Sequence, residues 1–483
     1  MAIGMHSQSG QAGCHDRSFM ECKPIQHDVI VIGGGSAGYA AARAAREDGA
    51  DVAIVDPGPL GGLCILRGCM PSKTILRSAE VAALMRRSKE FGLSPVDIKA
   101  GLGAIVDRKD RLVREFARDR INQLRGPSHT LYEAAARFIS PTAIQVGGRQ
   151  LTARAFIIAT GSVPRVEALP GLDNIGYLTS DELLDIRDQP NSLLILGGGP
   201  VALELGQFFS RIGTKVYFIQ RGLRVLSHLD EEIGTTLEEA LRAEGAELFT
   251  GTILREVGRH HRLKSVRFSH RGQDRTVSGE EILAAFGRRP NIDGLNLDAA
   301  QVTIHQGRIS VDSRMRTSQP HIFAVGDVCN LIDTTHIAIQ QGELAAHNAC
   351  HLEDSSKQYD DRLETKVVFT DPQVAVVGLS ERACRLHDIP FLTEAYPFAD
   401  HGKAMCLGST RGYAKLLASP RTGKLLGAQI VGPQAGELIH ELIAVMYYHG
   451  TVFDLVRYPH YHPTLAEIVT YPAESLMRQI RSS

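Results

Sequence analysis

Two stretches of the chain share one succession of apolar and polar positions. Residues 28–32 (DVIVI) form a largely apolar run closed by glycines, an alanine-rich helical stretch covers 37–47, and a second run covers 51–55. Short runs of this kind predict strands buried on both faces, as in a parallel sheet. The same order returns later, with a strand at 193–196, a helix to about residue 212 and a strand at 215–219. Two such βαβ units predict two nucleotide-binding domains.

The pattern changes after about residue 360. Alternation at 413–417 and 425–431 predicts antiparallel strands, and residues 436–448 predict a helix with one apolar face. We therefore predict an α/β protein with two doubly wound domains followed by an α+β domain. The predicted division is a flexible extension at 1–27, a first nucleotide-binding domain at 28–158 that resumes at 290–358, a second at 159–289, and the α+β domain at 359–483.

Composition excludes two classes of partner. The 483 residues carry 53 basic and 54 acidic side chains, a net charge of −1. This balance gives no long-range field to attract nucleic acid or an anionic membrane, so we expect neither. No apolar stretch approaches the ~20 residues that span a bilayer, and residues 1–27 contain no hydrophobic run typical of a secretory signal. We expect a cytoplasmic protein.

Eight cysteines occur in the chain, and only 14/22 and 64/69 are near neighbours. In a reducing cytosol a close pair is better interpreted as catalytic or metal-binding than as a structural disulfide. We interpret Cys14 and Cys22 as surface thiols on the N-terminal extension. Cys64 and Cys69 are the pair that can carry chemistry.

The first βαβ unit contains a glycine pattern typical of dinucleotide sites. Gly33, Gly35 and Gly38 give GxGxxG between the first strand and its helix, where backbone can approach a pyrophosphate at the helix N-terminus. Asp56 ends the next strand, where its carboxylate can accept ribose hydroxyls. A glycine-rich turn followed by a strand-end acid is the alternative without a ligand.

The segment 61–73 (GGLCILRGCMPSK) predicts a redox pair. Five steps along a regular helix turn two side chains about 140° apart, so Cys64 and Cys69 need the distortion that Gly68 permits. Pro71 fits the first turn of a helix, which would place Cys69 at its positive end and lower the thiol pKa. Zinc binding and an inert buried pair are the alternatives, and zinc would need further ligands that the neighbourhood lacks. We predict no metal site.

These segments resemble the class I pyridine nucleotide–disulfide oxidoreductases, the class of dihydrolipoamide dehydrogenase, glutathione reductase and mercuric reductase. The resemblance covers residues 28–470. Besides 61–73, the motifs in order are GGGSAG at 33–38, ATGSVP at 159–164, GGGPVALELG at 197–206, FGRRPN at 286–291, AVGD at 324–327, TDPQVAVVG at 370–378 and HYHPTLAE at 460–467. It implies FAD and NAD(P) as cofactors and a homodimer whose third domain forms the interface.

The resemblance assigns roles to individual residues. Cys64 would exchange with the thiol substrate, and Cys69 would form a charge-transfer pair with the flavin. Lys73 would lie near flavin N5 with Glu204 as its ionic partner, a pair that can stabilise negative charge on reduced flavin. The residues implied for FAD are Gly33, Gly35, Ser36, Gly38, Asp56, Gly62, Lys73, Thr160, Gly161, Gly326, Asp327 and Thr335.

Two further features bear on the chemistry. The class usually has Asn two residues after the first cysteine, and this chain has Leu66 followed by Arg67, which alters hydrogen bonding around the pair. In the motif at 460–467, His462 resembles the base contributed by the partner subunit, with Glu467 fixing its tautomer. His460 is interpreted as supporting.

The second glycine pattern predicts the nicotinamide site. Gly197, Gly199 and Ala202 give GxGxxA, and Gln220 stands where NAD-using members carry an acid. Arg221 follows it and can bind a 2′-phosphate, so NAD and NADP both remain open. The full set implied for NAD(P) is Gly197, Gly199, Ala202, Gln220, Arg221, Gly287 and Arg288.

The form of the cysteine motif favours one substrate class. Ser72 gives the PSK ending more typical of dihydrolipoamide dehydrogenase than of glutathione reductase, so we favour dihydrolipoyl groups, with a lipoyl-carrying protein as a candidate partner. An NADPH-dependent reductase of low-molecular-weight disulfides is the alternative. A mercuric reductase is disfavoured because that group has Tyr in place of His462 and ends in a vicinal cysteine pair. A non-catalytic component of a multienzyme complex is the alternative outside enzymes.

Overall fold

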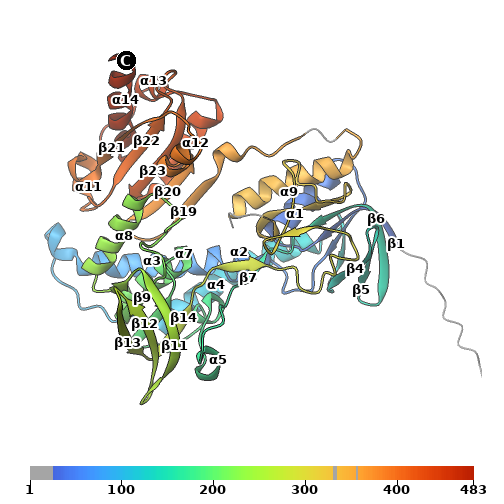
Figure 1. Cartoon of the computed structure of the whole chain (residues 1–483), viewed down its shortest axis with the longest axis horizontal. Coiled ribbons are helices and arrows are strands. Elements are labelled where there is room, and N and C mark those ends of the chain that lie inside the picture. The colour runs from blue at the N-terminus through green and yellow to red at the C-terminus, as the bar shows by residue number, and fades with distance from the viewer. Residues whose placement is uncertain (1–24, 330–333, 355–356, 483) are drawn as a thin grey trace, which may run out of the picture.

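Three β-sheets with their helices make up three lobes of the molecule (Figure 1). The computed structural model describes residues 25–329, 334–354 and 357–482. Two of the large sheets are wholly or mainly parallel, and the third is antiparallel. The predicted fold class is therefore confirmed.

The first sheet runs β3-β2-β1-β6-β5-β4, with β18 added to β6. Strand β2 is buried over its whole length and β1 and β6 over their last four residues, because helices cover them, which is why the sequence shows apolar runs there. Its strands are β1 (Ile25–Ile32), β2 (Val52–Val55), β3 (Thr130–Tyr132), β4 (Ala136–Ser140), β5 (Ala143–Val146), β6 (Arg149–Ile158) and β18 (Ile322–Ala324). The covering helices α1 (Ser36–Glu47) and α9 (Thr335–Cys350) lie side by side (Figure 1).

The first strand begins earlier than the sequence predicted. Residues 25–27 were placed in the extension, but Ile25, Gln26 and His27 pair with β6. His27 is buried, and its Nδ1 lies 2.7 Å from a carboxylate oxygen of Asp51. Polar residues extend the strand because this partner satisfies the imidazole. The rest of the predicted extension, with Cys14 and Cys22, lies outside the described residues.

Helices α2 to α4 follow β2 and cross the centre of the molecule. Their bounds are α2 (Gly62–Leu66), α3 (Cys69–Arg86) and α4 (Leu102–Leu124), with a short turn η1 (Ser88–Phe91) after α3. Helix α3 packs against α4 and also against α7 (Pro200–Ile212) of the second lobe. The first lobe thereby reaches into the second.

The second sheet runs β10-β9-β8-β14, all parallel. An antiparallel meander of β11, β12 and β13 lies beside it. The strands are β8 (Ser192–Leu196), β9 (Lys215–Ile219), β10 (Glu247–Phe249), β11 (Thr252–His260), β12 (Leu263–His270), β13 (Gln273–Gly279) and β14 (Glu281–Ala284). The helices are α5 (Leu172–Ile175), α6 (Ser180–Leu183), α7 and α8 (Glu231–Ala243).

A two-stranded ribbon joins the first two lobes. It pairs β7 (Ser162–Pro164) with β15 (Arg288–Pro290), the points where the chain leaves and re-enters the first lobe. The domain boundary predicted between 289 and 290 therefore falls inside a strand. A small hairpin of β16 (Ile304–His305) and β17 (Arg308–Ile309) and the turn η2 (Gly326–Val328) belong to the returning segment.

The third sheet runs β19-β20-β23-β22-β21 and is antiparallel. Its strands are β19 (Thr365–Val368), β20 (Gln373–Gly378), β21 (Leu392–Pro397), β22 (Tyr413–Ala418) and β23 (Leu425–Gly432). The surrounding helices are α10 (Glu381–Leu386), α11 (Gly402–Cys406), α12 (Ala435–Tyr447), α13 (Val452–Arg457) and α14 (Thr470–Ser482), with turns η3 (Asp361–Leu363), η4 (Phe398–Asp400) and η5 (Leu465–Val469). Leu442 and Met446 of α12 are buried, as the helical pattern predicted.

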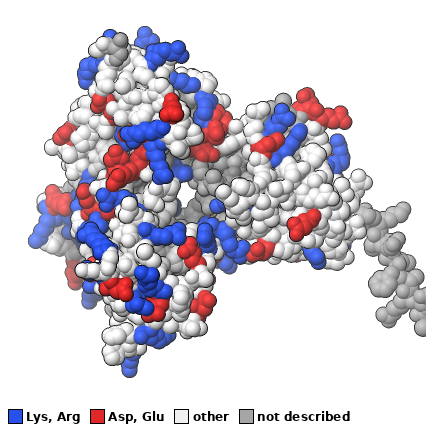
Figure 2. All heavy atoms as spheres, in the orientation of Figure 1, with Lys and Arg blue, Asp and Glu red and all other residues white. Residues whose placement is uncertain are grey.

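The surface agrees with the charge balance of the sequence. Basic and acidic side chains are interspersed over the face shown in Figure 2, without a large area of one sign. Within the described ranges, no helix combines the length and the apolar character that a membrane span needs.

The second and third lobes are joined through a buried charge cluster. Lys415 of β22 is 5% exposed, and its Nζ donates to Glu381 at 2.9 Å and lies 3.5 Å from Asp230, the residue before α8. Gln429 donates to the same Asp230 carboxylate. A buried charge is tolerated only when paired, so this cluster depends on the lysine.

Replacing Lys415 with Met should destabilise the protein, because two carboxylates would lose their shared cation. Removing one partner of a buried ionic cluster costs about 3–5 kcal/mol. Urea unfolding followed by circular dichroism should show this loss for Lys415→Met and almost none for Lys89→Met, which removes an exposed lysine. Equal midpoints for the two variants would contradict the structural role of the cluster.

Candidate active site

The two glycine-rich turns have the same geometry. Gly33 follows β1 with φ of 106°, and Gly197 follows β8 with φ of 136°. A Cβ at Gly33 would lie 2.4 Å from the carbonyl oxygen of Ala159, and one at Gly197 would lie 2.3 Å from that of Ala285. Only glycine fits either position. Gly35 and Gly199 then precede the first residues of α1 and α7, where backbone N–H groups are free to bind an anion.

The predicted ribose acid is held at the first turn. Asp56 follows β2, and its carboxylate accepts from Gly34 N–H at 2.6 Å and Gly58 N–H at 2.7 Å. Gly62, at the start of α2, meets Gly35 so closely that a Cβ would lie 2.6 Å from the Gly35 Cα. The starts of α1 and α2 are therefore in contact. Ser36 is the first and Gly38 the third residue of α1.

The predicted redox cysteines lie in two consecutive helices, α2 and α3. Cys64 is within α2, and Cys69 is the first residue of α3, with Arg67 and Gly68 between the helices. The helix is broken where the sequence required a distortion. The Cys69 sulfur lies 3.5 Å from the hydroxyl of Thr335, the first residue of α9. Both cysteines are half-buried thiols in this structure.

The two thiols have opposite acidities. The pKa of Cys69 is lowered to about 6, first because Cys64 hydrogen-bonds its sulfur; burial opposes this, and Thr335 and the charge of Lys73 assist. The pKa of Cys64 is raised by the same hydrogen bond, by burial and by the charge on Cys69. Near neutral pH the pair holds one thiolate, on Cys69, and one proton, on Cys64.

An ion pair with a buried carboxylate flanks the cysteines. Lys73, one turn along α3 from Cys69, donates to Glu204 of α7 at 2.6 Å. The other Glu204 oxygen accepts from the backbone N–H of Phe369, and Lys73 Nζ lies 4.6 Å from the centre of the Phe369 ring. The three residues come from the three lobes. The predicted partnership of Lys73 and Glu204 is present as a contact.

Asp327 lies in a network beside the linking ribbon. Its carboxylate accepts from the Ser162 hydroxyl at 2.6 Å, and Arg288 donates to Ser162 through Nε and Nη2, both at 2.8 Å. Arg288 was predicted for the nicotinamide site. In the structure its guanidinium donates to Ser162, the same residue whose hydroxyl donates to Asp327. Gly326, next to Asp327, donates its N–H to Gln341 of α9 at 3.0 Å. Ser162 was not singled out from the sequence, although it stands inside the ATGSVP motif.

Unpaired polar atoms remain where the resemblance implies FAD. The hydroxyls of Thr160 and Thr334 are buried without a hydrogen-bond partner, beside the first glycine turn and before α9 respectively. Gly161 links Thr160 to the ribbon, where its carbonyl accepts from Asn291 N–H. Buried hydroxyls seldom remain unpaired in a complete site. These residues therefore fit a bound polar cofactor.

At the second glycine turn an amide side chain, Gln220, takes the place that the carboxylate of Asp56 has at the first. Gln220 follows β9 and packs against Gly198, where a Cβ would lie 2.9 Å from its side-chain carbonyl carbon. The Arg221 side chain is 82% exposed, with Glu167 at 3.9 Å. Arg224 lies between Glu231 and Glu238, at 3.4 and 3.7 Å. Arg221 is thus the arginine left to meet a phosphate. Ala202 is buried in α7, and Gly287 has a φ of 97° just before β15.

The predicted base lies in the third lobe. His462 Nδ1 is 2.8 Å from Glu467, and the second Glu467 oxygen accepts from Thr464 N–H at 2.8 Å. Burial acts to raise the pKa of Glu467, but the bonds from Thr464 and His462 lower it overall. The His462 side chain is 78% exposed, so its Nε2 is open to a molecule outside this chain. His460 is paired with Glu441 at 2.6 Å, as a supporting residue would be.

His462 and the cysteines do not meet within one chain. The segment between α13 and α14 lies at the far end of the third lobe, well away from α2 in Figure 1. Five tyrosines of this lobe are exposed to solvent, namely Tyr447, Tyr448, Tyr458, Tyr461 and Tyr471. Exposed aromatic side chains gathered in one region are typical of a protein interface.

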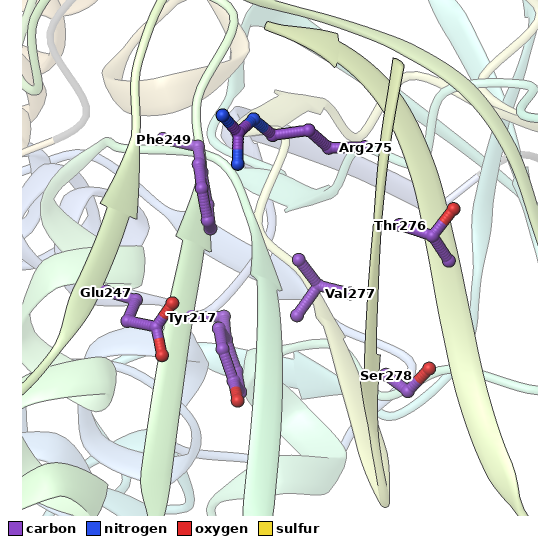
Figure 3. Close-up of a pocket in the computed structure, with 7 residues that line it drawn as sticks. All are labelled: Tyr217, Glu247, Phe249, Arg275, Thr276, Val277 and Ser278. Atoms are coloured by element: carbon purple, nitrogen blue, oxygen red, sulfur yellow. The ribbon is translucent and has the colours of Figure 1, made fainter. Parts of the chain in front are cut away.

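A separate pocket lies in the second lobe (Figure 3). It has a volume of about 390 Å³ between β9, β10 and β13, and Tyr217, Phe249 and Val277 point into it. None of the predicted site residues lines it. The candidate site is instead the set of helix starts around the cysteines.

Known proteins share this sequence and arrangement. Residues 27–342 match the family described as pyridine nucleotide-disulphide oxidoreductase, and residues 365–473 match the dimerisation domain of that family. Mercuric reductase of Staphylococcus aureus is 34% identical over 416 residues, which are 86% of this chain and 76% of that protein. Dihydrolipoyl dehydrogenase of Bacillus subtilis is 31% identical over 433 residues, covering 86% of this chain and 90% of that protein.

A solved structure has the same fold. LpdA from Mycobacterium tuberculosis superposes with a TM-score of 0.85 at 27% identity, over 93% of this chain and all of that one. The similarity thus extends across all three lobes.

The acidity of Cys69 should depend on its neighbour. In the reduced protein, alkylation of Cys69 should increase as the pH rises through about 6, because the thiolate is the reactive form. Cys64→Ala removes the strongest hydrogen bond to that thiolate and should move the transition to higher pH. Mass spectrometry of the alkylated peptide gives the profile, with Cys406→Ala, an exposed thiol, as the control. An unchanged profile in Cys64→Ala would show that Cys64 does not stabilise the thiolate.

Proposed function

The chain belongs to the pyridine nucleotide-disulphide oxidoreductase family, and we propose that Cys64 and Cys69 pass electrons between NAD(P)(H) and a dithiol or disulfide substrate. Members of the family bind FAD and NAD(P) and act on sulfur groups. The single observation that carries the proposal is the placement of the cysteines: Cys64 lies in α2, and Cys69 begins α3 beside the hydroxyl of Thr335, where its pKa is lowered to about 6. In such a pair Cys64 is suited to exchange with the thiol substrate, and Cys69 is suited to interact with the flavin.

The residues of the first glycine turn would hold FAD, which when bound supplies two-electron transfer between nicotinamide and dithiol. Asp56 would accept from the ribose, and the free N–H groups at the start of α1 would bind the pyrophosphate. Thr160, Thr335 and Asp327 would complete the cradle. Lys73 would place its cation beside the ring, with Glu204 holding it in position.

The cysteines would act by thiol–disulfide exchange. With the pair oxidised, a substrate thiolate attacks the sulfur of Cys64, the S–S bond breaks, and Cys69 leaves as a thiolate. The second substrate thiolate attacks the substrate sulfur of the mixed disulfide and releases Cys64. The substrate has then lost two electrons and two protons, and the cysteine pair has gained the two electrons. Cys69 is the better leaving group because its pKa is lower.

His462 would move the protons. Its Nδ1 is engaged by Glu467, so Nε2 can accept the proton of an incoming thiol, and Glu467 stabilises the resulting cation. Glu467 is kept ionised for this task by its bond from Thr464. Since His462 lies far from the cysteines of its own chain, it would serve those of a partner subunit.

We propose dihydrolipoyl groups as the substrate class, with the low-molecular-weight disulfides as the second candidate. The PSK ending of the motif and the similarity to dihydrolipoyl dehydrogenase of Bacillus subtilis support the first. The relation to mercuric reductases makes Hg(II) a necessary comparison. Either nicotinamide fits, since Gln220 can bond a hydroxyl and the exposed Arg221 can bind a phosphate.

Spectroscopy and turnover test this function together. Purified protein should oxidise dihydrolipoamide faster than it reduces glutathione disulfide or Hg(II), measured with both nicotinamides. Two-electron reduction of the wild type should give a broad long-wavelength band from the Cys69 thiolate. Cys64→Ser, whose Cys69 has no disulfide partner, should show this band without added reductant, and Cys69→Ser should not show it. Reduction by nicotinamide without turnover of any dithiol or disulfide would contradict the proposed substrate class. Loss of the band in Cys64→Ser alone would reverse the roles of the cysteines.

Mixed dimers test whether each site is shared between subunits. Cys64→Ser and His462→Ala homodimers should both be nearly inactive, because each lacks an essential group at both sites. In a mixed dimer one site carries both lesions and the other carries neither. Coexpression with random pairing makes half the dimers mixed, so activity should return to about a quarter of wild type. Activity that stays at the level of the parents would place each site within a single chain.

A further inference from the structure

Arg120 of α4 lies over the ring of Tyr39, and in the described part of the chain it has no acidic partner. Its guanidinium lies 4.1 Å from the centre of the Tyr39 ring, on α1, and is half-buried. Burial acts to lower the pKa of Arg120, while Tyr39 and Cys64 are the neighbours whose charges raise it. In the part of the chain that the structure describes, no carboxylate pairs with this guanidinium. The guanidinium of Arg120 remains positively charged, and its N–H groups can donate hydrogen bonds to a ligand.

The packing of α4 places Arg120 on the face of the helix that meets α1 and the first glycine turn. Leu124, one turn further along, is fully buried and would touch a Cβ at Gly34 at 3.4 Å. Residues four apart share a helix face, so Arg120 faces the same glycine turn and the start of α1. Helix α2, which carries Cys64, packs against α4. Arg120 therefore lies against Tyr39 of α1 and belongs to a helix that packs against the one that carries Cys64.

The other arginine near Cys64 has a different environment. Arg67, between the two cysteines, is more than half exposed and lies 3.3 Å from Asp181. Its charge is already balanced by that carboxylate. The stacking on Tyr39 holds Arg120 in place without neutralising it, because a ring face attracts a cation but carries no net charge. An oriented, unneutralised guanidinium is suited to bind a carboxylate or a phosphate.

We propose that Arg120 selects thiol substrates that carry an anionic group, holding that group while Cys64 exchanges with the sulfur. This inference rests on the proposed function, and it narrows the substrate class to anionic dithiols or disulfides. Arg120 is a specificity residue in this assignment. It takes no part in the transfer of electrons or protons.

Alkylation tests the assignment without a known substrate. Iodoacetate and iodoacetamide both transfer a two-carbon group to a thiolate with loss of iodide, and they differ in one negative charge. The rates are measured at Cys64 in a Cys69→Ser background, because Cys69 would otherwise react first and its charge raises the pKa of Cys64. Taking the ratio of the two rates cancels any change in the acidity of Cys64, since that acidity affects both reagents equally. Arg120→Gln should lower the iodoacetate-to-iodoacetamide ratio by about three- to tenfold, as expected for one charge at short range near solvent. Rising salt should reduce the wild-type ratio toward that of the variant.

Arg118→Gln is the matched control. Arg118 is an exposed arginine on the same helix, two residues away and therefore on another face. Arg118→Gln changes the net charge of the protein by the same amount as Arg120→Gln, but on another face of the helix. The iodoacetate-to-iodoacetamide ratio of Arg118→Gln should therefore stay at the wild-type value. Equal ratios for wild type and Arg120→Gln, or an equal fall in both variants, would overturn the proposal.

Turnover separates this proposal from the function on which it rests. Dihydrolipoate and dihydrolipoamide have the same dithiol, and only the first is an anion. Wild type should favour dihydrolipoate, and Arg120→Gln should lose that preference through a higher KM, with kcat and the band of the Cys69 thiolate unchanged. Turnover of both dithiols without preference would overturn the role of Arg120 and leave the function standing. Absence of all turnover would overturn the function, while the alkylation ratio would still decide the role of Arg120.

Discussion

The carboxylate of Glu204 is buried where the three lobes meet, and a buried charge has to be paired. Its two oxygens are satisfied by Lys73 from the first lobe and by the backbone of Phe369 from the third, while Glu204 itself belongs to the second. The helix that carries Lys73 also begins with Cys69. Satisfying this carboxylate therefore fixes the position of the cysteine pair relative to both other lobes. The reactive geometry follows from an electrostatic requirement that no lobe can meet alone.

Most of the architecture follows from patterns within short stretches of sequence. Apolar runs between glycines predicted the parallel strands, because a strand buried on both faces must be apolar at every position. The break between α2 and α3 followed from the angle between residues five apart on a helix. The early start of β1 could not be predicted, because His27 extends the strand only through its contact with Asp51, which is made in the folded chain.

The site was predicted where one motif holds the residues and missed where distant segments meet. Cys64 and Cys69 are five residues apart and could be paired from their spacing. The assignment of Arg288 to the nicotinamide site stays a prediction. Its bonds to Ser162 join segments 126 residues apart, and such a contact could not be read from the motif. Arg120 belongs to no motif at all. Its environment depends on the packing of α4 against two other helices, which local spacing does not encode.

The insertion of one lobe within another sets an order on the folding of the growing chain. Strand β18 and helix α9 complete the first lobe, yet they are synthesised only after the whole of the second. Until about residue 350 leaves the ribosome, β6 lacks a neighbour and α1 lacks the helix that covers it. Domains fold as units during synthesis, so the uninterrupted second lobe can close first while the N-terminal segment waits with apolar surface exposed. The segment made first is therefore among the last to reach its final packing.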